Sequence, residues 1–310
     1  MILTITLNPS IDICYYMDSY SINDINRCRN YVKTAGGKGI NVSKVLRNLG
    51  NKVIATGFLG GATGQLIEEQ LSDFKIVSEF VKIDGDTRNC IAIISGEEQT
   101  EILESGPIIT EKDSENLKRL IIDILKNNHI NVISASGSLP EGLRDDFYID
   151  LIEIAKEENL KFVLDTSAKY LKNAIKVAPF LIKPNISELE NLLGTNINSE
   201  DQLIETLYHL RKYNVEMIVV SLGKEGSIAL CGNDIYKVTI PTVDIMSPVG
   251  SGDALVAGMV SEIDKGSSYE EILRVGNTCG VLNAMNRKTG HIDMDDFGEV
   301  YGKVKVKMIR

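Results

Sequence analysis

The sequence predicts a doubly wound α/β fold, in which helices flank a mostly parallel sheet and a small β-sheet is inserted. Short apolar runs rich in β-branched residues recur along the chain, as in parallel strands that are buried on both faces. Longer stretches with an amphipathic, helix-like spacing of apolar residues lie between these runs. The predicted strands are Ile2 to Leu7, Val53 to Phe58, Asn131 to Ala135, Phe162 to Leu164, Phe180 to Ile182 and Met217 to Val220. The predicted helices include Glu115 to Lys126, Phe147 to Glu157 and Gln202 to Lys212.

Two segments interrupt this alternation and predict the inserted sheet. Residues 10–34 are polar and broken by Asp and Asn, and residues 85–106 contain two runs, TRNCIAII and TEILES, that look like paired strands. A sheet beside the carboxyl ends of a parallel sheet is well placed to cover a ligand crevice and exclude water. The chain of 310 residues can bury one large core, so we expect a single domain, residues 1–310, with this lid.

The composition argues against several classes of function. Hydrophobic residues make up 43% of the chain and charged residues 25%, which is typical of a globular protein. The net charge of −10 and the pI near 5.0 would repel nucleic acid or an anionic membrane, so neither partner is expected. The N-terminus opens as a strand without the form of a signal peptide, so we expect a cytoplasmic protein.

The cysteines and histidines disfavour further chemistries. Five scattered cysteines without a CxxC pair predict reduced thiols rather than disulfides or a metal centre. These are Cys14, Cys28, Cys90, Cys231 and Cys279. The three histidines, His129, His209 and His291, leave few candidates for a histidine-assisted nucleophile, so a covalent hydrolase is disfavoured.

The most informative segment is PVGSGD at residues 248–253, which is followed directly by the helix-like run ALVAGMVSEI. A glycine-rich turn that enters a helix offers unpaired backbone N–H groups and a positive dipole end, which together bind an anion such as a phosphoryl group. Asp253 would stand at the rim of this anion hole and act as a catalytic base. The alternative for Asp253 is a helix N-cap, a common role for Asp at a helix start.

A second glycine cluster, AGGKGIN at residues 35–41, also precedes a predicted helix. Its glycines allow the backbone to approach a ligand closely, and Lys38 and Asn41 can bond hydroxyls or phosphate. It is neither a Walker A loop nor a dinucleotide fingerprint, because GxxxxGK[ST] is absent and no strand is expected directly before it. A purely structural tight turn is the alternative.

A third segment, KPNISE at residues 183–188, lies between a predicted strand and the helix-like run SELENLLG. Asn185 and Glu188 are spaced to share a hydrated Mg²⁺, an ion that keeps most of its waters and needs few protein oxygens. The same spacing also fits a capping box, in which the two side chains close the first helical turn.

These segments resemble the PfkB-type, ribokinase-like carbohydrate kinases over essentially the whole chain. AGGKGINVSKVLRNLG and SPVGSGDALVAGMV resemble the two family signatures, and KPNISE and SLGKEG resemble the nucleotide-site motifs between them. The resemblance implies a ribokinase-like fold and the phosphorylation of a small sugar by ATP with Mg²⁺. Within the family, NPSIDI, KTAGGKG, DTRNCIAI, TEILESGP and SGSLP look most like the tagatose-6-phosphate kinases. That similarity implies transfer to the C1 hydroxyl of tagatose 6-phosphate.

The resemblance also implies roles for individual residues. In catalysis, Asp253 takes the proton of the attacking hydroxyl while the amides of Gly250, Ser251 and Gly252 hold the γ-phosphoryl group. Family members commonly carry Ala where this chain has Ser251, but the contact is from the backbone. The implied sugar-site residues are Asp12, Gly37, Lys38 and Asn41 for the hydroxyls, and Arg27, Arg88 and Ser138 for the existing phosphate. The implied nucleotide-site residues are Lys183, Asn185 and Glu188 near the phosphates and Mg²⁺, Ser221, Gly223 and Gly226 along the nucleotide, and Asn283 near the base.

The predicted lid supports two further expectations. Strand alternation puts Arg88, Cys90, Ala92 and Ile94 on one face, so Arg88 has a defined direction toward the crevice. The polar edge and isolated strands of the lid suggest that two copies pair through it as a homodimer.

Two alternatives remain open. Within the enzymes, 1-phosphofructokinase and the minor 6-phosphofructokinase are near relatives, and no single residue excludes them. From another class, a catalytically silent sugar-phosphate sensor on the same fold is disfavoured, because Asp253, Gly250 and Gly252 are all intact.

Overall fold

A ten-stranded sheet forms the centre of the molecule in a computed structural model that describes residues 1–96 and 98–310. The strand order is β14-β13-β12-β11-β10-β9-β8-β1-β4-β5, and pairing is parallel from β5 to β11 and antiparallel from β11 to β14. The strands are β1 (Ile2–Thr6), β4 (Val53–Leu59), β5 (Val77–Lys82), β8 (Val132–Ser136), β9 (Lys161–Asp165), β10 (Leu181–Ile182), β11 (Met217–Ser221), β12 (Ser227–Cys231), β13 (Asp234–Thr239) and β14 (Lys305–Met308).

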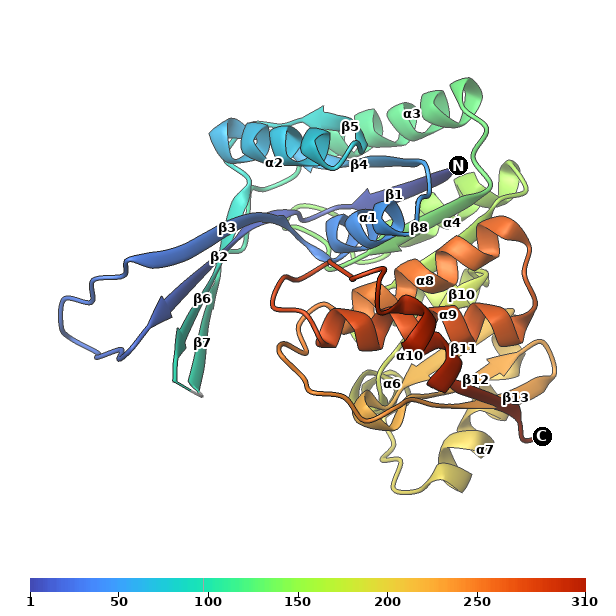
Figure 1. Ribbon diagram of the computed structural model, residues 1–310. Helices are drawn as coiled ribbons and strands as arrows, with labels where there is room; N and C mark the ends of the chain where they lie inside the picture. The colour runs from blue at the N-terminus through green and yellow to red at the C-terminus, as the bar shows by residue number, and fades with distance from the viewer. Residues whose placement is uncertain (97) are drawn as a thin grey trace.

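Helices pack against the large sheet in two separate hydrophobic cores (Figure 1). The first core contains α1 (Lys38–Asn48), α2 (Gly61–Asp73), α8 (Ser251–Lys265), α9 (Tyr269–Ala284) and α10 (Phe297–Lys303). The second contains α3 (Glu111–Asn127), α4 (Phe147–Glu157), α5 (Ala168–Ala174), α6 (Ile186–Leu193) and α7 (Glu200–Leu210). Short 3₁₀ turns are η1 (Ile175–Val177), η2 (Arg211–Tyr213) and η3 (Gly223–Glu225).

The two cores follow from the period of a strand. Successive side chains point to opposite faces of a sheet, so Met217 and Val219 enter the first core while Ile218 and Val220 enter the second. Every residue of β1 is buried, as expected for a strand covered on both faces.

A second sheet of four strands extends from the main body (Figure 1). Its order is β3-β2-β6-β7, with β2 and β6 parallel and the outer pairs antiparallel. The strands are β2 (Ser10–Met17), β3 (Asn30–Gly36), β6 (Arg88–Ser95) and β7 (Glu98–Leu103). All eight residues of β6 are half-buried, so this sheet is thinly covered.

The predicted fold class is confirmed: a mostly parallel sheet is flanked by helices and accompanied by a smaller sheet. One local expectation was wrong, because a strand does precede the AGGKGIN cluster. β3 ends at Gly36, and Gly37, with a φ of 97°, is the N-cap residue of α1. The alternating pattern of β3 is hidden in the sequence because most of its side chains are exposed. No helix among the described residues has the length and apolar character needed to span a membrane.

Candidate active site

The structure brings most of the predicted site residues together in one pocket of about 420 Å³. The pocket lies at the carboxyl ends of the parallel strands, where open α/β sheets bind ligands. The root of the small sheet also lines it; this is the part that contains Ser10 and Asp12 at the start of β2 and Arg88 at the start of β6. Twelve predicted residues line it: Asp12, Gly37, Lys38, Asn41, Arg88, Lys183, Asn185, Glu188, Ser221, Gly250, Gly252 and Asp253. Ser10, Cys90, Asp165 and Val249 line it too, and sequence reasoning did not assign them to the site.

Asp253 stands in the first turn of α8 but does not cap the helix. Gly250 occupies the N-cap with a φ of 81°, a conformation that glycine adopts without strain. The carboxylate of Asp253 is buried and accepts a hydrogen bond of 2.9 Å from the side-chain amide of Asn41 on α1. The Oδ1 atom of Asn41 is buried without a partner among the described residues, which leaves it free to accept a bond from a ligand hydroxyl. The N-cap alternative for Asp253 therefore does not hold.

Burial raises the pKa of Asp253 to about 6, and the nearby charge of Asp165 adds to this effect. Lys38, the Asn41 hydrogen bond and Lys183 act in the opposite direction and keep the pKa from rising further. A carboxylate whose pKa approaches neutrality is a better proton acceptor than an ordinary Asp, yet it is still ionised at pH 7. The environment of Asp253 therefore suits a general base.

The turn before α8 offers backbone amides to an anion, but not all of those expected. The first helical bond runs from the amide of Ala254 to the carbonyl of Gly250 at 2.9 Å, so the amides before Ala254 have no helical partner. The amide of Ser251 instead donates to the Pro248 carbonyl at 3.3 Å within the turn. The amides of Gly252 and Asp253 are thus the better placed donors.

Asp165, at the end of β9, links the two lysines of the pocket. Its Oδ1 lies 3.3 Å from Nζ of Lys183, and its Oδ2 lies 3.5 Å from Nζ of Lys38. The Asp165 side chain is only 1% exposed and that of Lys183 only 6% exposed, so this pair is shielded from water, whereas the Lys38 side chain is 42% exposed. Asp165 is also the largest influence on Lys38, whose pKa it raises. The ammonium of Lys38 therefore stays charged in the pocket.

Asn185 and Glu188 form the capping box that was the alternative to a metal site. The Asn185 Oδ1 accepts from the Glu188 amide at 2.8 Å, and the Glu188 Oε2 accepts from the Asn185 amide at 3.0 Å. Both residues still line the pocket beside Asp165. Within residues 1–96 and 98–310, no group of three or more His, Cys, Asp or Glu is arranged to enclose a metal ion. A hydrated Mg²⁺ fits such a sparse set of oxygens, because it keeps most of its waters.

The opposite side of the pocket is formed by the root of the small sheet. Asp12 accepts a hydrogen bond of 2.7 Å from the Ser10 hydroxyl, and burial raises the pKa of its carboxyl. The guanidinium of Arg88 donates to the carbonyls of Glu104 at 3.0 Å and Asn8 at 3.1 Å. These bonds fix the guanidinium at the pocket wall, where Cys90 lies next to it on the same face of β6.

Six predicted residues do not line the pocket. They are Arg27, Ser138, Gly223, Gly226, Ser251 and Asn283. Arg27 is exposed in the loop between β2 and β3. This loop lies at the end of the small sheet that is farthest from the large sheet (Figure 1). Gly226 has a structural reason to be glycine, because a Cβ there would lie 2.2 Å from the Val238 carbonyl oxygen.

Asn283 is fully buried and its amide is bonded to two loops. It donates to the Val249 carbonyl at 2.9 Å and accepts from the Gly290 amide at 3.0 Å. Asn283 therefore holds the segment that enters the Gly250 turn, while a contact with the base stays a prediction.

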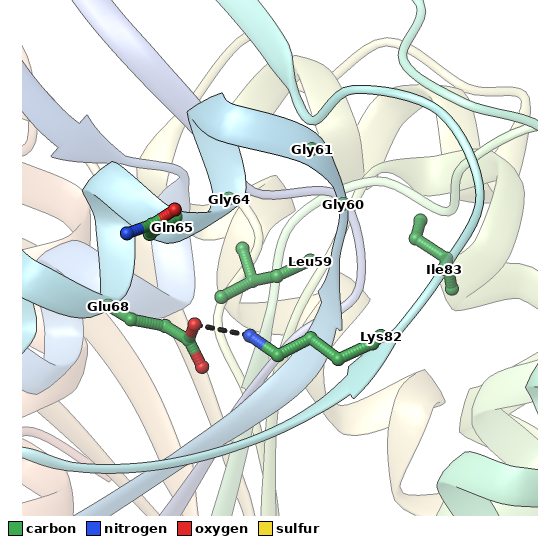
Figure 2. Close-up of a pocket in the computed structure, with 8 residues that line it drawn as sticks. All are labelled: Leu59, Gly60, Gly61, Gly64, Gln65, Glu68, Lys82 and Ile83. Atoms are coloured by element: carbon green, nitrogen blue, oxygen red, sulfur yellow. Dashed lines mark hydrogen bonds and ion pairs between the residues drawn. The ribbon is translucent and has the colours of Figure 1, made fainter.

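A separate hollow of about 330 Å³ lies between α2 and the end of β5 (Figure 2). Figure 2 shows Lys82 reaching the carboxylate of Glu68 across it, so the two charged groups neutralise each other. None of the predicted site residues lines this hollow.

Comparison with known proteins decides the family. The model of the pfkB family carbohydrate kinases matches residues 5–295, which is nearly the whole chain. The chain belongs to the pfkB family of carbohydrate kinases. The predicted family and enzyme class, an ATP-dependent carbohydrate kinase, are therefore confirmed.

Individual relatives and solved structures agree with this family. Tagatose-6-phosphate kinases from two strains of Staphylococcus epidermidis are 45% identical to this chain over 309 residues, which is 99% of this chain and of each relative. Phosphofructokinase-2 from Escherichia coli has a TM-score of 0.91 at 27% identity, covering 97% of this chain and 98% of that one. A Thermotoga maritima protein described as a possible 1-phosphofructokinase has a TM-score of 0.89 at 26% identity, with 100% of both chains covered.

The raised pKa of Asp253 predicts an acidic limit to activity. As the pH falls through about 6, the carboxylate gains a proton and loses its capacity to accept another, so kcat at saturating substrates should fall. The measurement is kcat from about pH 5 to about pH 8, with a coupling system that is in excess at every pH. Saturation matters because a sugar phosphate has its own pKa of about 6, which acts on KM. A kcat that is constant across this range would contradict a base with this pKa.

Proposed function

We propose that this chain transfers the γ-phosphoryl group of ATP to the C1 hydroxyl of D-tagatose 6-phosphate, giving D-tagatose 1,6-bisphosphate and ADP. The observation that carries the proposal is a single pocket with the buried base Asp253 at the Gly250–Gly252 turn and the guanidinium of Arg88 at the opposite wall. The 45% identity to proteins named tagatose-6-phosphate kinase, over nearly the full length, supports this substrate.

In the proposed reaction, Asp253 accepts the proton of the C1 hydroxyl as its oxygen attacks the γ-phosphorus. The bond between the γ-phosphorus and the oxygen that bridges it to the β-phosphate breaks, and ADP leaves with that oxygen. Asn41 donates to Asp253 and so orients the carboxylate toward the incoming hydroxyl. Positioning and charge neutralisation, rather than covalent help from the protein, dominate the catalysis of phosphoryl transfer.

Charge that develops on the transferring group needs cationic partners. A Cβ on Gly252 would lie 3.5 Å from Nζ of Lys183, so the ammonium and the turn amides border the same space. Lys183 and Lys38 therefore provide two of the positive charges that phosphoryl transfer requires. Asn185 and Glu188 would hold Mg²⁺ through its waters, and the bound ion would neutralise further phosphate charge.

Arg88 is proposed to bind the 6-phosphate and thereby set the register of the sugar. A guanidinium suits a phosphate dianion because it donates two parallel hydrogen bonds. Burial leaves Nε of Arg88 without a partner among the described residues, so this donor is available to a ligand. Asp12 and the Oδ1 of Asn41 would then accept bonds from the sugar hydroxyls between the two ends.

A second candidate is a phosphofructokinase activity on fructose 1- or 6-phosphate. The likeness in fold to phosphofructokinase-2 and to the Thermotoga maritima protein, whose names point to fructose phosphates, supports it. Tagatose and fructose 6-phosphates differ in configuration at one hydroxyl, and a site that reads a hydroxyl by hydrogen bonding can discriminate sharply. Substrate preference therefore has to be measured directly.

The substrate class is tested by parallel kinetics on four sugars. We expect the highest kcat/KM with D-tagatose 6-phosphate, lower values with fructose 6-phosphate and fructose 1-phosphate, and the lowest with unphosphorylated tagatose. The last sugar would lose the Arg88 contact and with it a charged hydrogen bond. A preference for either fructose phosphate would replace the proposed substrate by the second candidate. Equal activity on unphosphorylated tagatose would remove the sugar-phosphate class.

Replacement of the base separates catalysis from binding. Asp253→Asn keeps the size of the side chain but removes its capacity to accept a proton, so kcat should fall by about 10²-fold or more. The dissociation constant for tagatose 6-phosphate, measured by calorimetry, should change little because the proposed binding groups are elsewhere. Asp234→Asn, a change outside the pocket, serves as the control. Near-normal turnover in Asp253→Asn would rule out this residue as the base.

Replacement of Arg88 tests the proposed phosphate site. Arg88→Ala should raise KM for the sugar phosphate about 30-fold, equivalent to about 2 kcal/mol for a lost charged hydrogen bond. KM for ATP should stay close to normal. Arg119→Ala removes an exposed arginine on α3 and should leave both constants unchanged. Unchanged sugar-phosphate kinetics in Arg88→Ala would mean that the phosphate binds elsewhere.

We also propose that two copies form a homodimer through the small sheet. Its outer strands β3 and β7 carry exposed apolar side chains, Tyr31 and Val32 on one and Ile102 and Leu103 on the other. Such unpaired, apolar edges favour association. One of the structures of Escherichia coli phosphofructokinase-2 is a tetrameric inhibited form, so that relative assembles.

Sedimentation tests the proposed dimer. We expect the native chain to sediment as a dimer at micromolar concentration, and Leu103→Glu to shift the population toward monomer because it would bury a charge at the interface. Lys126→Glu on α3, away from the small sheet, is the control. A native chain that sediments as a monomer would refute the pairing.

A further inference from the structure

Lys44 is a buried lysine that has no role in the proposed reaction. It lies on α1 and is 3% exposed, although most lysines in proteins keep their ammonium group in water. A charge held away from water costs stability unless it has close partners. The contacts of Lys44 therefore indicate what it does.

Those contacts hold the end of strand β3. Nζ of Lys44 donates to the carbonyl of Ala35 and lies 5.8 Å from the ring centre of Phe74, which caps α2. Gln70 on α2 acts on the same residue, because its Oε1 accepts from the Ala35 amide at 2.6 Å. Since β3 is an edge strand of the small sheet, side chains from α1 and α2 supply bonds on the side where no further strand pairs.

The end of β3 that Lys44 and Gln70 hold lies directly beside Asp12. Ala35 pairs with Ile11 and Gly36 pairs with Ser10, so the end of β3 is in register with the residues around Asp12. A Cβ on Gly36 would lie 2.1 Å from Oδ2 of Asp12, which means that the carboxylate lies directly against the Gly36 backbone. A shift of the peptide between Ala35 and Gly36 would therefore move the Asp12 carboxylate.

The charge state of Lys44 depends on its burial and on two carboxylates. Burial lowers its pKa to about 8, while the carboxylates of Asp12 on β2 and Asp253 on α8 act to raise it. The Phe74 ring and the Ala35 carbonyl contribute no titratable group. Lys44 is therefore charged at pH 7 and loses its proton as the pH rises through about 8. A neutral amine forms a weaker bond to a carbonyl than an ammonium does.

We propose that Lys44 is a positioning residue for sugar binding, which holds the Ala35 carbonyl and thereby keeps the Asp12 carboxylate in place to accept a sugar hydroxyl. The inference rests on the proposed role of Asp12 in the sugar site. Lys44 itself does not line the pocket, so it acts through Asp12 and not by touching the substrate.

Substitution of Lys44 tests the effect on sugar binding. Lys44→Met keeps the length of the side chain and removes its donor, so KM for tagatose 6-phosphate at pH 7 should rise about tenfold while KM for ATP changes less than about twofold. Lys44→Arg restores a charged donor and should recover part of the lost affinity. Lys52→Met removes an exposed lysine between α1 and β4 and should leave both constants unchanged. Thermal unfolding of each variant shows whether it is folded.

The pH dependence gives a readout that a purely structural role would not change. Above about pH 7 the sugar phosphate stays a dianion, so changes in its KM report on the protein. In the native chain, KM for the sugar phosphate should rise several-fold between about pH 7.5 and about pH 9.5 as Lys44 loses its charge. The rise should be absent in Lys44→Met, whose KM is already high. It should also be absent in Lys44→Arg, because a guanidinium keeps its proton over this range.

The outcomes separate this inference from the proposed function. If a folded Lys44→Met keeps a normal sugar KM, or if the alkaline rise persists in Lys44→Arg, the role assigned to Lys44 is wrong. Should Lys44→Met fail to fold, the pH profile of Lys44→Arg decides alone. Asp12→Asn is measured in parallel, and a normal sugar KM in that variant would remove Asp12 from the sugar site, a failure of the proposed function itself.

Discussion

The ion pairs of Asp165 with Lys38 and Lys183 are the interactions on which the rest of the site depends. Without this carboxylate, the buried ammonium of Lys183 would lose the group with which it is paired, and a buried unpaired charge is costly. The same carboxylate helps to raise the pKa of Asp253. Asp165 therefore acts both on the two lysines and on the proposed base. Its own burial makes both effects strong, because water that would screen them is excluded.

The fold explains how charges so distant in sequence meet. Asp165 ends β9 and Lys183 directly follows β10, and these neighbouring parallel strands finish at the same edge of the sheet. Helices α1 and α8 begin at that edge. Lys38 and Asn41 lie in the first turn of α1, and Asp253 lies in the first turn of α8. A parallel sheet thus collects polar side chains at one edge while its faces stay apolar, and the cores need not accommodate the chemistry.

The sequence predicted the alternating strands and helices and the glycine-rich turns, because both leave a local signature. It did not reveal Asp165, which ends the ordinary strand KFVLD and becomes notable only when Lys38 and Lys183 approach it in space. Gly250 and Gly252 of the predicted anion hole line the pocket, but the turn bond of Ser251 depends on the backbone course and has no sequence signal. Arg27 and Arg88 were both predicted to bind the existing phosphate, yet of the two only Arg88 lines the pocket.

In the part of the chain that the structure describes, the small sheet has no separate hydrophobic core, and the end nearest the large sheet packs into the first core through Ile11, Ile13 and Ala35. Its central strand β6 is half-buried throughout, and a thinly covered sheet of few strands has little burial to stabilise it. Its best-anchored part is its root, where Asp12, Arg88 and the Lys44-bound end of β3 meet the pocket. A ligand that bonds to Asp12 and Arg88 would hold the root on its pocket side, while Lys44 and Gln70 hold it through Ala35. If the sugar binds to Asp12 and Arg88 as proposed, its binding and the order of the small sheet are linked through the same few residues, so each would stabilise the other.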